Sequence, residues 1–369
     1  MQQAYTNATI FTGETFLENH AVIVNDGLIE AVIPKENLPA DCAIIDCRNH
    51  YLVPSFTDLQ VYGASGKLFS AFPSTEALQL LAQHNAESGT AACLVTIATQ
   101  PLPVIEACIE AIKTYLGQGG KGIMGMHLEG PYINAEKRGA HVKEWVVNPT
   151  LEEVKTLLQK AEGVIKMVTL APEWIDEKII QLFADNGVIV SIGHSNASFE
   201  QATKVMNNGA KSVTHLYNAM SPLHHREPGL VGAVMQHPIA TASIIPDGIH
   251  VHYEAVKIAK QIMGERLFFI TDAVPSTNVG PYQHVYNTDH YDLPNGTLSG
   301  SALTMLKAVS NAVEHCNISL AEAIRMASLY PARLMGLQNQ YGKIEKGFAA
   351  TIALLSKDLQ TATLPGSSF

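Results

Sequence analysis

The sequence predicts an α/β protein: a (β/α)8 TIM-like barrel with a small β-sandwich domain built from both chain ends. Apolar runs alternate with helical patterns through the middle of the chain, and both ends are rich in strand-forming residues. Alternation of this kind favours a parallel sheet with helices packed outside it. Eight such units over about 250 residues match the size of a TIM barrel. The alternative, an open doubly wound sheet, lacks a Gly-rich dinucleotide motif after its first strand.

Eight short apolar runs are the expected barrel strands. In chain order they are "PSFTDL", "AACLVTI", "GIMGMHL", "VIKMVTL", "GVIVSIG", "KSVTHL", "ATASIIP" and "RLFFIT". Helical patterns lie between most of them, and three begin at recognisable caps. We expect helices over 74–89, from a Ser/Thr cap, over 150–163, from Thr150, and over 198–209, where a capping box precedes the stop at Gly209.

The two chain ends carry the pattern of a second, all-β unit. "AVIVNDGLIEAVIP" reads as two strands around the turn Asn25-Asp26-Gly27. "GKIEKGFAATIALLS" near the other end is also rich in strand formers. We therefore predict a β-sandwich domain formed by residues 1–53 plus 337–369 and a metal-dependent hydrolase barrel formed by residues 54–336.

Composition limits the classes of partner. The formal net charge is −10, which argues against nucleic-acid and anionic-membrane binding because both depend on basic surfaces. The first residues, "MQQAYTNATIF", have no basic region and no long apolar run, and no segment of 18 or more apolar residues occurs elsewhere. The five cysteines are scattered and odd in number, which indicates free thiols in a reducing compartment. We expect a cytoplasmic protein.

Ionisable side chains follow five of the eight expected strands. They are Glu129, His194, His215, Asp247 (with His250 just beyond it) and Asp272. One such residue alone would usually be structural. Because the strands of a parallel barrel end on one face, five of them predict a shared site.

Two imidazoles and a carboxylate suggest a metal centre. Glu129, His194 and His215 would leave one position open on a divalent ion, as catalytic zinc sites require. Water bound there ionises near neutral pH. Asp272 is then left free to move protons.

A series of ordered motifs identifies a family. "HLEGP", "GHSNA", "THLYNAM", "REPGL", "DGIHV", "TDA" and "GTLSGSALTM" occur in this order between residues 127 and 305, and "LYPAR" follows. The sequence resembles the N-acetylglucosamine-6-phosphate deacetylases of the amidohydrolase superfamily over nearly its whole length. The resemblance implies hydrolysis of the N-acetyl group to glucosamine 6-phosphate and acetate.

The resemblance also implies roles for individual residues. Glu129, His194 and His215 correspond to metal ligands, Asp272 to the catalytic acid/base, and His141 to a histidine that holds the substrate and polarises its carbonyl. The implied substrate contacts are Ala140, His141, Asn218, Ala219, Arg226, Asp247, Gly248, Ile249, His250, Leu298, Ser299 and Gly300. Among them, Arg226 suits a phosphate by its fixed charge and forked geometry.

One position departs from the superfamily pattern. Many amidohydrolases carry His-x-His at the end of the first barrel strand, where this chain has Gln60 and Tyr62. Neither an amide nor a phenol is a good metal ligand at neutral pH. We therefore expect one metal ion per subunit. Zn²⁺ is favoured, with Fe²⁺ or another divalent ion left open. Tyr62 is also bulky for this position.

The polar stretch 275–300 is long for a barrel loop. We expect it to form a hairpin over the site, with Asn295-Gly296 as its turn. His224 and His225 are possible loop contacts near Arg226. The remaining histidines that we place on loops or helix faces, and regard as incidental, are His20, His84, His284, His290 and His315.

Three other functions compete with the deacetylase. The enzyme could act on another N-acetyl amino-sugar phosphate, such as N-acetylgalactosamine 6-phosphate. A cyclic-amide hydrolase is disfavoured because His-x-His and a metal-bridging lysine are absent. A non-catalytic sugar-phosphate-binding barrel would have lost catalytic positions that are intact here. The family usually forms dimers, so we expect a homodimer or larger homo-oligomer in which Arg226 or His250 can reach a neighbour's substrate.

Overall fold

A computed structural model describes residues 2–365; residues 1 and 366–369, which the predicted small domain includes, lie outside the described part. Its largest sheet has eight parallel strands in the order β17-β16-β15-β14-β13-β12-β11-β8. These are β8 (Phe56–Val61), β11 (Thr90–Ile97), β12 (Ile123–Glu129), β13 (Ile165–Leu170), β14 (Ile189–Ile192), β15 (Ser212–Val213), β16 (Thr241–Ile244) and β17 (Leu267–Phe269). All eight predicted strands are confirmed, and neighbours in sequence are neighbours in the sheet, as a TIM barrel requires.

Two backbone hydrogen bonds join the first and last strands where the sheet closes on itself. The N–H of Asp272 donates to the carbonyl of Gln60 at 2.9 Å, and the N–H of Tyr62 donates to the carbonyl of Ala273 at 3.0 Å. These contacts lie at the carboxyl ends of the strands. The barrel is therefore held shut at the face where the ionisable residues gather.

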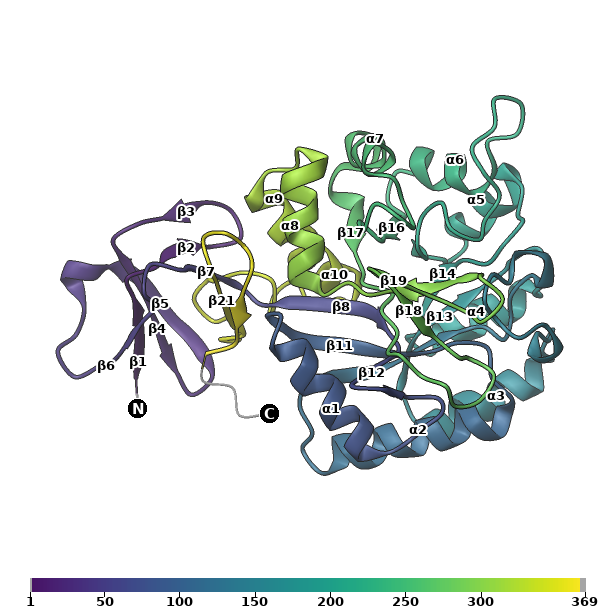
Figure 1. The fold of residues 1–369 in the computed structure, drawn as a ribbon, viewed down its shortest axis with the longest axis horizontal. Helices are drawn as coiled ribbons and strands as arrows, with labels where there is room; N and C mark the ends of the chain where they lie inside the picture. Colours follow the sequence, from purple (N-terminus) through teal and green to yellow (C-terminus); the bar gives the residue numbers. More distant parts are fainter. Residues whose placement is uncertain (1, 366–369) are drawn as a thin grey trace.

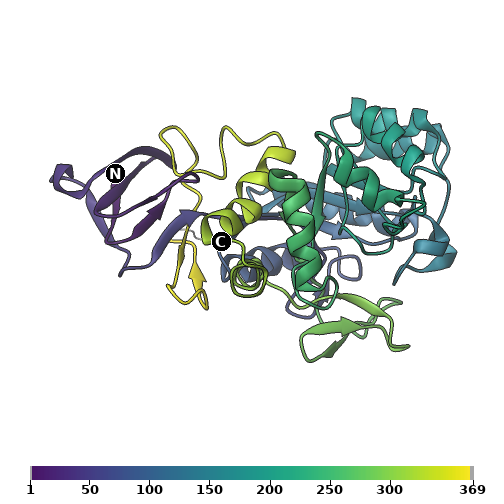
Figure 2. The same cartoon turned by 90° about the horizontal axis from the view of Figure 1, so that it is seen from above.

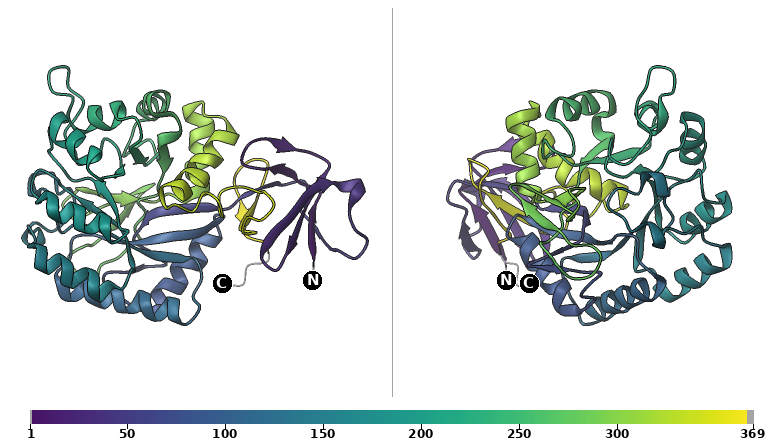
Figure 3. Two further views of the ribbon diagram at one scale, coloured as in Figure 1. Left: turned by 180° about the vertical axis from the view of Figure 1, so that it is seen from behind. Right: turned by 45° about the vertical axis from the view of Figure 1, so that its right-hand side comes forward.

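Helices surround the parallel strands (Figure 3). They are α1 (Thr75–Ala86), α2 (Leu102–Gly117), α3 (Leu151–Ala161), α4 (Glu177–Asp185), α5 (Phe199–Asn207), α6 (Gly229–Gln236), α7 (Tyr253–Met263), α8 (Met305–Cys316), α9 (Leu320–Ala327) and α10 (Leu329–Leu334). The three predicted starts are confirmed: Ser74 caps α1, and capping boxes open α3 at Thr150 and α5 at Ser198.

The chain ends pair in two further sheets at one end of the molecule (Figure 1). One sheet has the order β5-β4-β1-β6 and the other β22-β21-β7-β2-β3. The strands are β1 (Gln3–Thr6), β2 (Thr9–Phe11), β3 (Phe16–Leu17), β4 (His20–Asn25), β5 (Leu28–Pro34), β6 (Ala43–Asp46), β7 (Tyr51–Pro54), β21 (Ile352–Leu355) and β22 (Ala362–Thr363). The predicted turn between β4 and β5 is confirmed, since Asp26 and Gly27 both have positive φ.

A separate apolar cluster holds these end strands together. It joins Ile10, Val22 and Leu52 from the first part of the chain to Ile344 and Ile352 from the last part. Both ends therefore build one β unit, as the sequence indicates. Its division from the barrel at residues 53/54 and 336/337 stays a prediction.

The long polar stretch forms a three-stranded antiparallel sheet, β18 (Val285–Asn287), β19 (His290–Asp292) and β20 (Leu298–Ser301), which projects from the barrel (Figure 2). Asn295-Gly296 lies in the turn between β19 and β20, as predicted, and Gly296 has a φ of 81°. A second turn, between β18 and β19, makes the segment more than one hairpin.

The remaining elements are short. The strands β9 (Gly63–Ala64) and β10 (Lys67–Leu68) form a two-stranded sheet. The 3-10 turns lie at Lys35–Asn37, Ala135–Lys137, Lys143–Trp145 and Gly264–Arg266. Within residues 2–365, no helix is long and apolar enough to cross a membrane.

Two incidental histidines lie elsewhere than expected. His84 and His315 are on α1 and α8, and His284 is on a loop. The expectation of a loop or a helix face is wrong for His20, which opens β4, and for His290, which opens β19. Each of these histidines is the first residue of its strand, where the sequence pattern does not separate the strand from the preceding loop.

Candidate active site

The strand ends place four ionisable side chains on one face of the barrel. Glu129 is the last residue of β12, while His194, His215 and Asp272 follow β14, β15 and β17 within three residues. These last three have φ values of 48°, 38° and 54°. Left-handed backbone is uncommon for residues other than glycine and persists where surrounding contacts hold it, often at functional sites.

Three of these side chains converge on one point. His215 Nε2 lies 3.0 Å from His194 Nε2 and 3.1 Å from Glu129 Oε1, and His194 Nε2 lies 3.3 Å from the same oxygen. In a tetrahedral site with metal–ligand bonds of about 2.0–2.1 Å, donor atoms stand about 3.4 Å apart. The triangle therefore has nearly the size that one divalent ion needs.

The hydrogen bond of His194 leaves the correct nitrogen available. Its Nδ1 lies 2.9 Å from the backbone carbonyl of Lys137, which can only accept, so Nδ1 carries the proton. The lone pair of Nε2 then points toward Glu129 and His215. A carbonyl that fixes the tautomer of a ligand histidine is a common support in metal sites.

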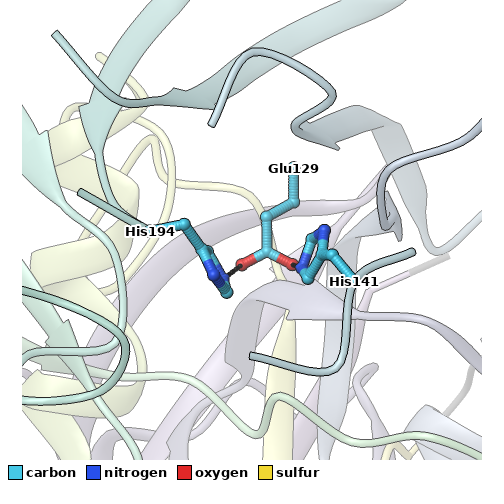
Figure 4. A group of neighbouring side chains, drawn as sticks. All are labelled: Glu129, His141 and His194. Carbon is cyan, nitrogen blue, oxygen red and sulfur yellow. Dashed lines mark hydrogen bonds and ion pairs between the residues drawn. The ribbon is translucent and has the colours of Figure 1, made fainter. Parts of the chain in front are cut away.

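His141 lies as close to Glu129 as His194 does (Figure 4). Its neutral ring, however, is the opposite tautomer. Donor atoms of Glu129, His141 and His194 all lie within 4.8 Å of one another, so distance alone admits His141 as a ligand. However, the backbone N–H of Thr99 donates to His141 Nδ1 at 3.2 Å. The Nδ1 atom is therefore unprotonated in the neutral ring. Nε2 bears the hydrogen and faces Glu129 Oε2 at 3.3 Å.

Burial keeps His141 neutral. Burial and, next, the neighbouring imidazole of His194 lower the pKa of His141 to about 4, against the attraction of Glu129. At neutral pH the ring is an uncharged N–H donor pointed into the site. It suits the stabilisation of an oxyanion better than the binding of a cation.

The pKa values of the two carboxyl groups, Glu129 and Asp272, are shifted in opposite directions. Burial would raise the pKa of Glu129, but the neighbouring imidazoles of His141, His194 and His215 hold it well below its usual range. Burial and the charge of Glu129 raise the pKa of Asp272. One carboxylate thus stays ionised among the imidazoles, while the other is better suited to accept and return a proton.

Several predicted substrate contacts border this cluster. Asn218 lies against the His215 backbone, with Nδ2 3.4 Å from the His215 carbonyl, and the carbonyl of Ala219 accepts from the N–H of Ser195 at 3.1 Å. Ala140 directly precedes the buried His141. Asn218 and Ala219 lie on the loop that follows His215, and Ala140 lies on the loop that carries His141.

Asp247 and His250 form a tight pair after β16. Asp247 Oδ2 lies 2.5 Å from His250 Nδ1, while Oδ1 accepts from the N–H groups of Ile249 and His250. Gly248 has a φ of 79° in this turn. The carboxylate therefore orients the ring of His250 and leaves Nε2 for another partner.

The run Leu298, Ser299 and Gly300 lies on β20 beside Asp272. The N–H of Ser301 donates to the Asp272 carbonyl at 3.0 Å. A Cβ built on Gly300 would lie 2.7 Å from the Val274 side chain, so only glycine allows this close approach. The projecting sheet is thus attached directly to the residue expected to move protons.

Arg226 is not brought to the buried cluster within its own chain. Among the described residues its side chain is exposed, and its Nε lies 3.0 Å from His225 Nε2. His224 and His225 are stacked on the same loop with ring centroids 4.1 Å apart. These three residues form an outward-facing polar group.

The fold and this geometry agree with known proteins. Residues 51–367 match the Amidohydrolase family, and residues 3–52 match the NagA composite domain. The chain belongs to the amidohydrolase family. The family uses a divalent metal ion, and the donor triangle of Glu129, His194 and His215 in this amidohydrolase is a candidate place for it.

Three relatives cover nearly the whole amidohydrolase chain. An N-acetylglucosamine-6-phosphate deacetylase from Haemophilus influenzae is 38% identical over 98% of this chain and 97% of its own length. An N-acetylgalactosamine-6-phosphate deacetylase from Escherichia coli O157:H7 is 32% identical over 95% and 94%. The crystal structure of an N-acetylglucosamine-6-phosphate deacetylase from Pasteurella multocida superimposes with a TM-score of 0.94 at 33% identity, over 99% and 98%.

Sequence reasoning missed the residues that orient the amidohydrolase site. Thr99 sets the tautomer of His141, and the Tyr282 hydroxyl holds this loop by donating to the Thr99 carbonyl at 2.6 Å. The Lys137 carbonyl sets the tautomer of His194. All three contacts use a backbone group of Thr99 or Lys137, and a backbone group leaves no residue signature. The hydroxyl of Tyr62, which is bulky for its position, donates a hydrogen bond to Glu129, a contact that the sequence does not indicate.

Proposed function

We propose that the protein hydrolyses the N-acetyl group of N-acetyl-D-glucosamine 6-phosphate, giving D-glucosamine 6-phosphate and acetate. The observation that carries the proposal is the triangle of Glu129 Oε1, His194 Nε2 and His215 Nε2 beside Asp272. The named activities of full-length relatives supply the substrate.

The metal fits the residues present. Glu129, His194 and His215 would hold it, since each can turn a lone pair toward a shared centre. A bound divalent ion supplies a water nucleophile at neutral pH and polarises the amide carbonyl. We propose Zn²⁺ as the ion. Fe²⁺ or another divalent ion stays open because the donor set does not select among them.

Asp272 carries the proton in both halves of the reaction. It accepts a proton from the attacking water and returns it to the departing amine, which is otherwise a poor leaving group. Burial and the charge of Glu129 raise the pKa of Asp272, which makes its carboxylate a stronger base for this exchange.

His141 stabilises the negative charge that develops on the carbonyl oxygen. Its Nε2–H is fixed by Thr99 and requires no reorganisation during the reaction. A donor of this kind is typically worth about 3–4 kcal/mol, or roughly 10²–10³ in rate.

Substrate binding needs groups beyond the buried cluster. We propose that Ala140, Asn218, Ala219, the run Asp247–His250 and the run Leu298–Gly300 surround the sugar. Arg226 anchors the phosphate. Because Arg226 is exposed in its own chain, we propose that it serves the site of a second subunit in a homodimer or larger homo-oligomer. We place the protein in the cytoplasm. All five cysteines are buried free thiols, as expected of a reducing compartment.

Acetate release from N-acetylglucosamine 6-phosphate tests the function. The purified protein should release acetate, lose activity with a chelator and regain it with Zn²⁺ or Fe²⁺. Asp272→Asn should lower kcat at least about a hundredfold. Absence of acetate release from the metal-loaded protein would reject the proposal.

N-acetylgalactosamine 6-phosphate is a second candidate substrate because a full-length relative bears that activity in its name. The two sugars differ at one hydroxyl. A comparison of kcat/KM for both epimers decides between them.

A further inference from the structure

The first barrel strand sends two neutral side chains into the site. Gln60 lies on β8, and Tyr62 directly follows Val61, the last residue of that strand. Because the two residues are two positions apart in extended chain, their side chains leave it on the same face. Gln60 is 1% exposed and Tyr62 7% exposed. Polar groups at such depth normally satisfy their hydrogen bonds within the protein.

Their partners are the two carboxylates of the proposed reaction. Gln60 Nε2 lies 2.7 Å from Asp272 Oδ1, 2.9 Å from Glu129 Oε1 and 3.0 Å from the Tyr62 hydroxyl oxygen. The Tyr62 hydroxyl donates to Glu129 Oε2. The pair therefore spans the space between Glu129 and Asp272.

Counting hydrogens orders these contacts. An amide nitrogen has two hydrogens, and a phenol has one. Tyr62 gives its hydrogen to Glu129, so its oxygen is free to accept from Gln60. Glu129 Oε1 also faces His194 and His215, where the metal ion would bind. The two amide hydrogens then go to Asp272 and Tyr62.

We propose that Gln60 and Tyr62 form a positioning pair, a hydrogen-bonded bridge that runs from Asp272 through Gln60 and Tyr62 to Glu129. The inference rests on the proposed function of Asp272 and Glu129. Tyr62 holds Glu129 Oε2 so that only Oε1 faces the two imidazoles. Gln60 aims the Asp272 carboxylate. Both act through the carboxylates of Asp272 and Glu129 and not on the substrate, so both are positioning residues.

The surroundings of Tyr62 make it suited to this task. Its ring packs in a cluster with Leu68, Val274 and Tyr282, which holds the ring in place. Val274 lies beside the segment that carries Asp272. Tyr282 lies beside the loop that carries His141. A hydroxyl on a fixed ring can hold a carboxylate rotamer better than a mobile side chain.

The decisive experiment compares Tyr62→Phe with Tyr115→Phe. Tyr62→Phe keeps the ring and removes only the hydroxyl. Tyr115, which lies on α2 away from the site, is the matched control. It is also buried, and its hydroxyl donates to the backbone carbonyl of Lys121. The readout is the Zn²⁺ dissociation constant, measured by competition with a chromogenic chelator and without substrate.

Loss of the Tyr62 hydroxyl should weaken Zn²⁺ binding about 10- to 100-fold, the usual effect of removing a group that orients a ligand. Tyr115→Phe should bind Zn²⁺ as the unmodified protein does. Equal affinities in all three proteins would overturn the role of Tyr62. This binding result stands even if no acetate is released, so it separates the inference from the proposed function.

Gln60→Met tests the other half of the bridge. Methionine keeps the length of the side chain and removes its donors. We expect kcat to fall about 10- to 100-fold with KM little changed, because Asp272 loses its orientation while the sugar contacts remain. An unchanged kcat, or a rise in KM alone, would overturn the role of Gln60. If Tyr62→Phe does not fold, two measurements decide: the kcat of Gln60→Met and the Zn²⁺ affinity of Tyr62→Trp, whose indole N–H is again a donor. Tight Zn²⁺ binding by Tyr62→Trp supports the pair. Failure of both variants to behave as expected rejects it.

Discussion

The backbone N–H of Thr99 donates to Nδ1 of His141 at 3.2 Å, and this contact determines which nitrogen of the imidazole carries the proton. A backbone amide cannot accept a hydrogen bond, so the neutral ring must carry its proton on Nε2. His141 and His215 both lie near Glu129, but Nε2 of the neutral His141 ring carries the proton, whereas no hydrogen bond to Nδ1 of His215 among the described residues prevents its Nε2 from offering a lone pair to a metal ion. Distance alone would group His141 with the ligands.

This difference predicts two distinct variants. His215→Gln should lose most bound metal, because one corner of the donor triangle disappears. His141→Gln should keep about one metal ion per chain and lose about 10²–10³ in kcat, the usual effect of removing an oxyanion donor. Metal analysis by mass spectrometry, together with acetate release, distinguishes the two. Loss of metal from His141→Gln would show that the ring binds the ion.

Stability should depend on pH through Asp58, a buried carboxyl beneath the site. Burial raises its pKa to about 7, although Thr271 Oγ1 donates to it at 2.5 Å and the Gln60 N–H at 3.1 Å. Its unfolded pKa is about 3.9. Between these values the folded protein holds a proton that the unfolded chain has released, so the stabilising contribution is complete below about pH 4 and is lost as the pH rises to about 7.

The variant Asp58→Asn lacks this titration. Relative to it, the unmodified protein should lose up to about 1.4 kcal/mol of unfolding free energy per pH unit between about pH 4 and 7. Urea unfolding of both proteins at several pH values measures the difference, and groups common to both cancel. Parallel curves for the two proteins would contradict the expected proton uptake.

The sequence predicts the parts of this protein that depend on local pattern. All eight barrel strands lie in apolar runs that the sequence shows directly. Glu129, His194 and His215 stand at or just after the ends of three of these strands. Because strand ends of a parallel barrel share a face, convergence could be inferred without coordinates.

What could not be predicted depends on contacts between distant residues. The bond from Tyr62 to Glu129 spans 67 residues, and that from Thr99 to His141 spans 42. No periodicity encodes such pairs. The second turn of the projecting sheet, at Thr288 and Asp289, also escaped prediction because its flanking strands are short and polar and lack the alternation that marks a half-buried strand.

The projecting sheet should contribute to turnover. Val285 and Asp292 are paired across β18 and β19, so residues 286–291 can be replaced by Gly-Gly in a two-residue turn. Strand β20, which contacts the Asp272 backbone, stays in place. We expect kcat/KM to fall at least about tenfold if closure of this segment excludes water. The melting temperature controls for misfolding. An unchanged kcat/KM in a folded variant would mean that the tip has no part in closure.

Arg226 should act on the phosphate of the substrate from a neighbouring subunit. Its guanidinium contacts only His225 among the described residues of its own chain. Arg226→Ala should raise KM for N-acetylglucosamine 6-phosphate about 10- to 100-fold with a smaller effect on kcat, because a charge-assisted hydrogen bond contributes about 1.5–3 kcal/mol.

Subunit mixing tests whether the arginine acts across an interface. Arg226→Ala and Asp272→Asn subunits are each poor enzymes at low substrate concentration. If Arg226 serves the partner's site, a mixed dimer contains one site with both an intact Asp272 and an arginine supplied by the other chain. Unfolding and refolding an equimolar mixture should then recover about a quarter of the normal activity, since half the dimers are mixed and each has one competent site. If Arg226 served its own site, no mixed site would combine intact Asp272 with intact Arg226, and the mixture would stay at the sum of its parents.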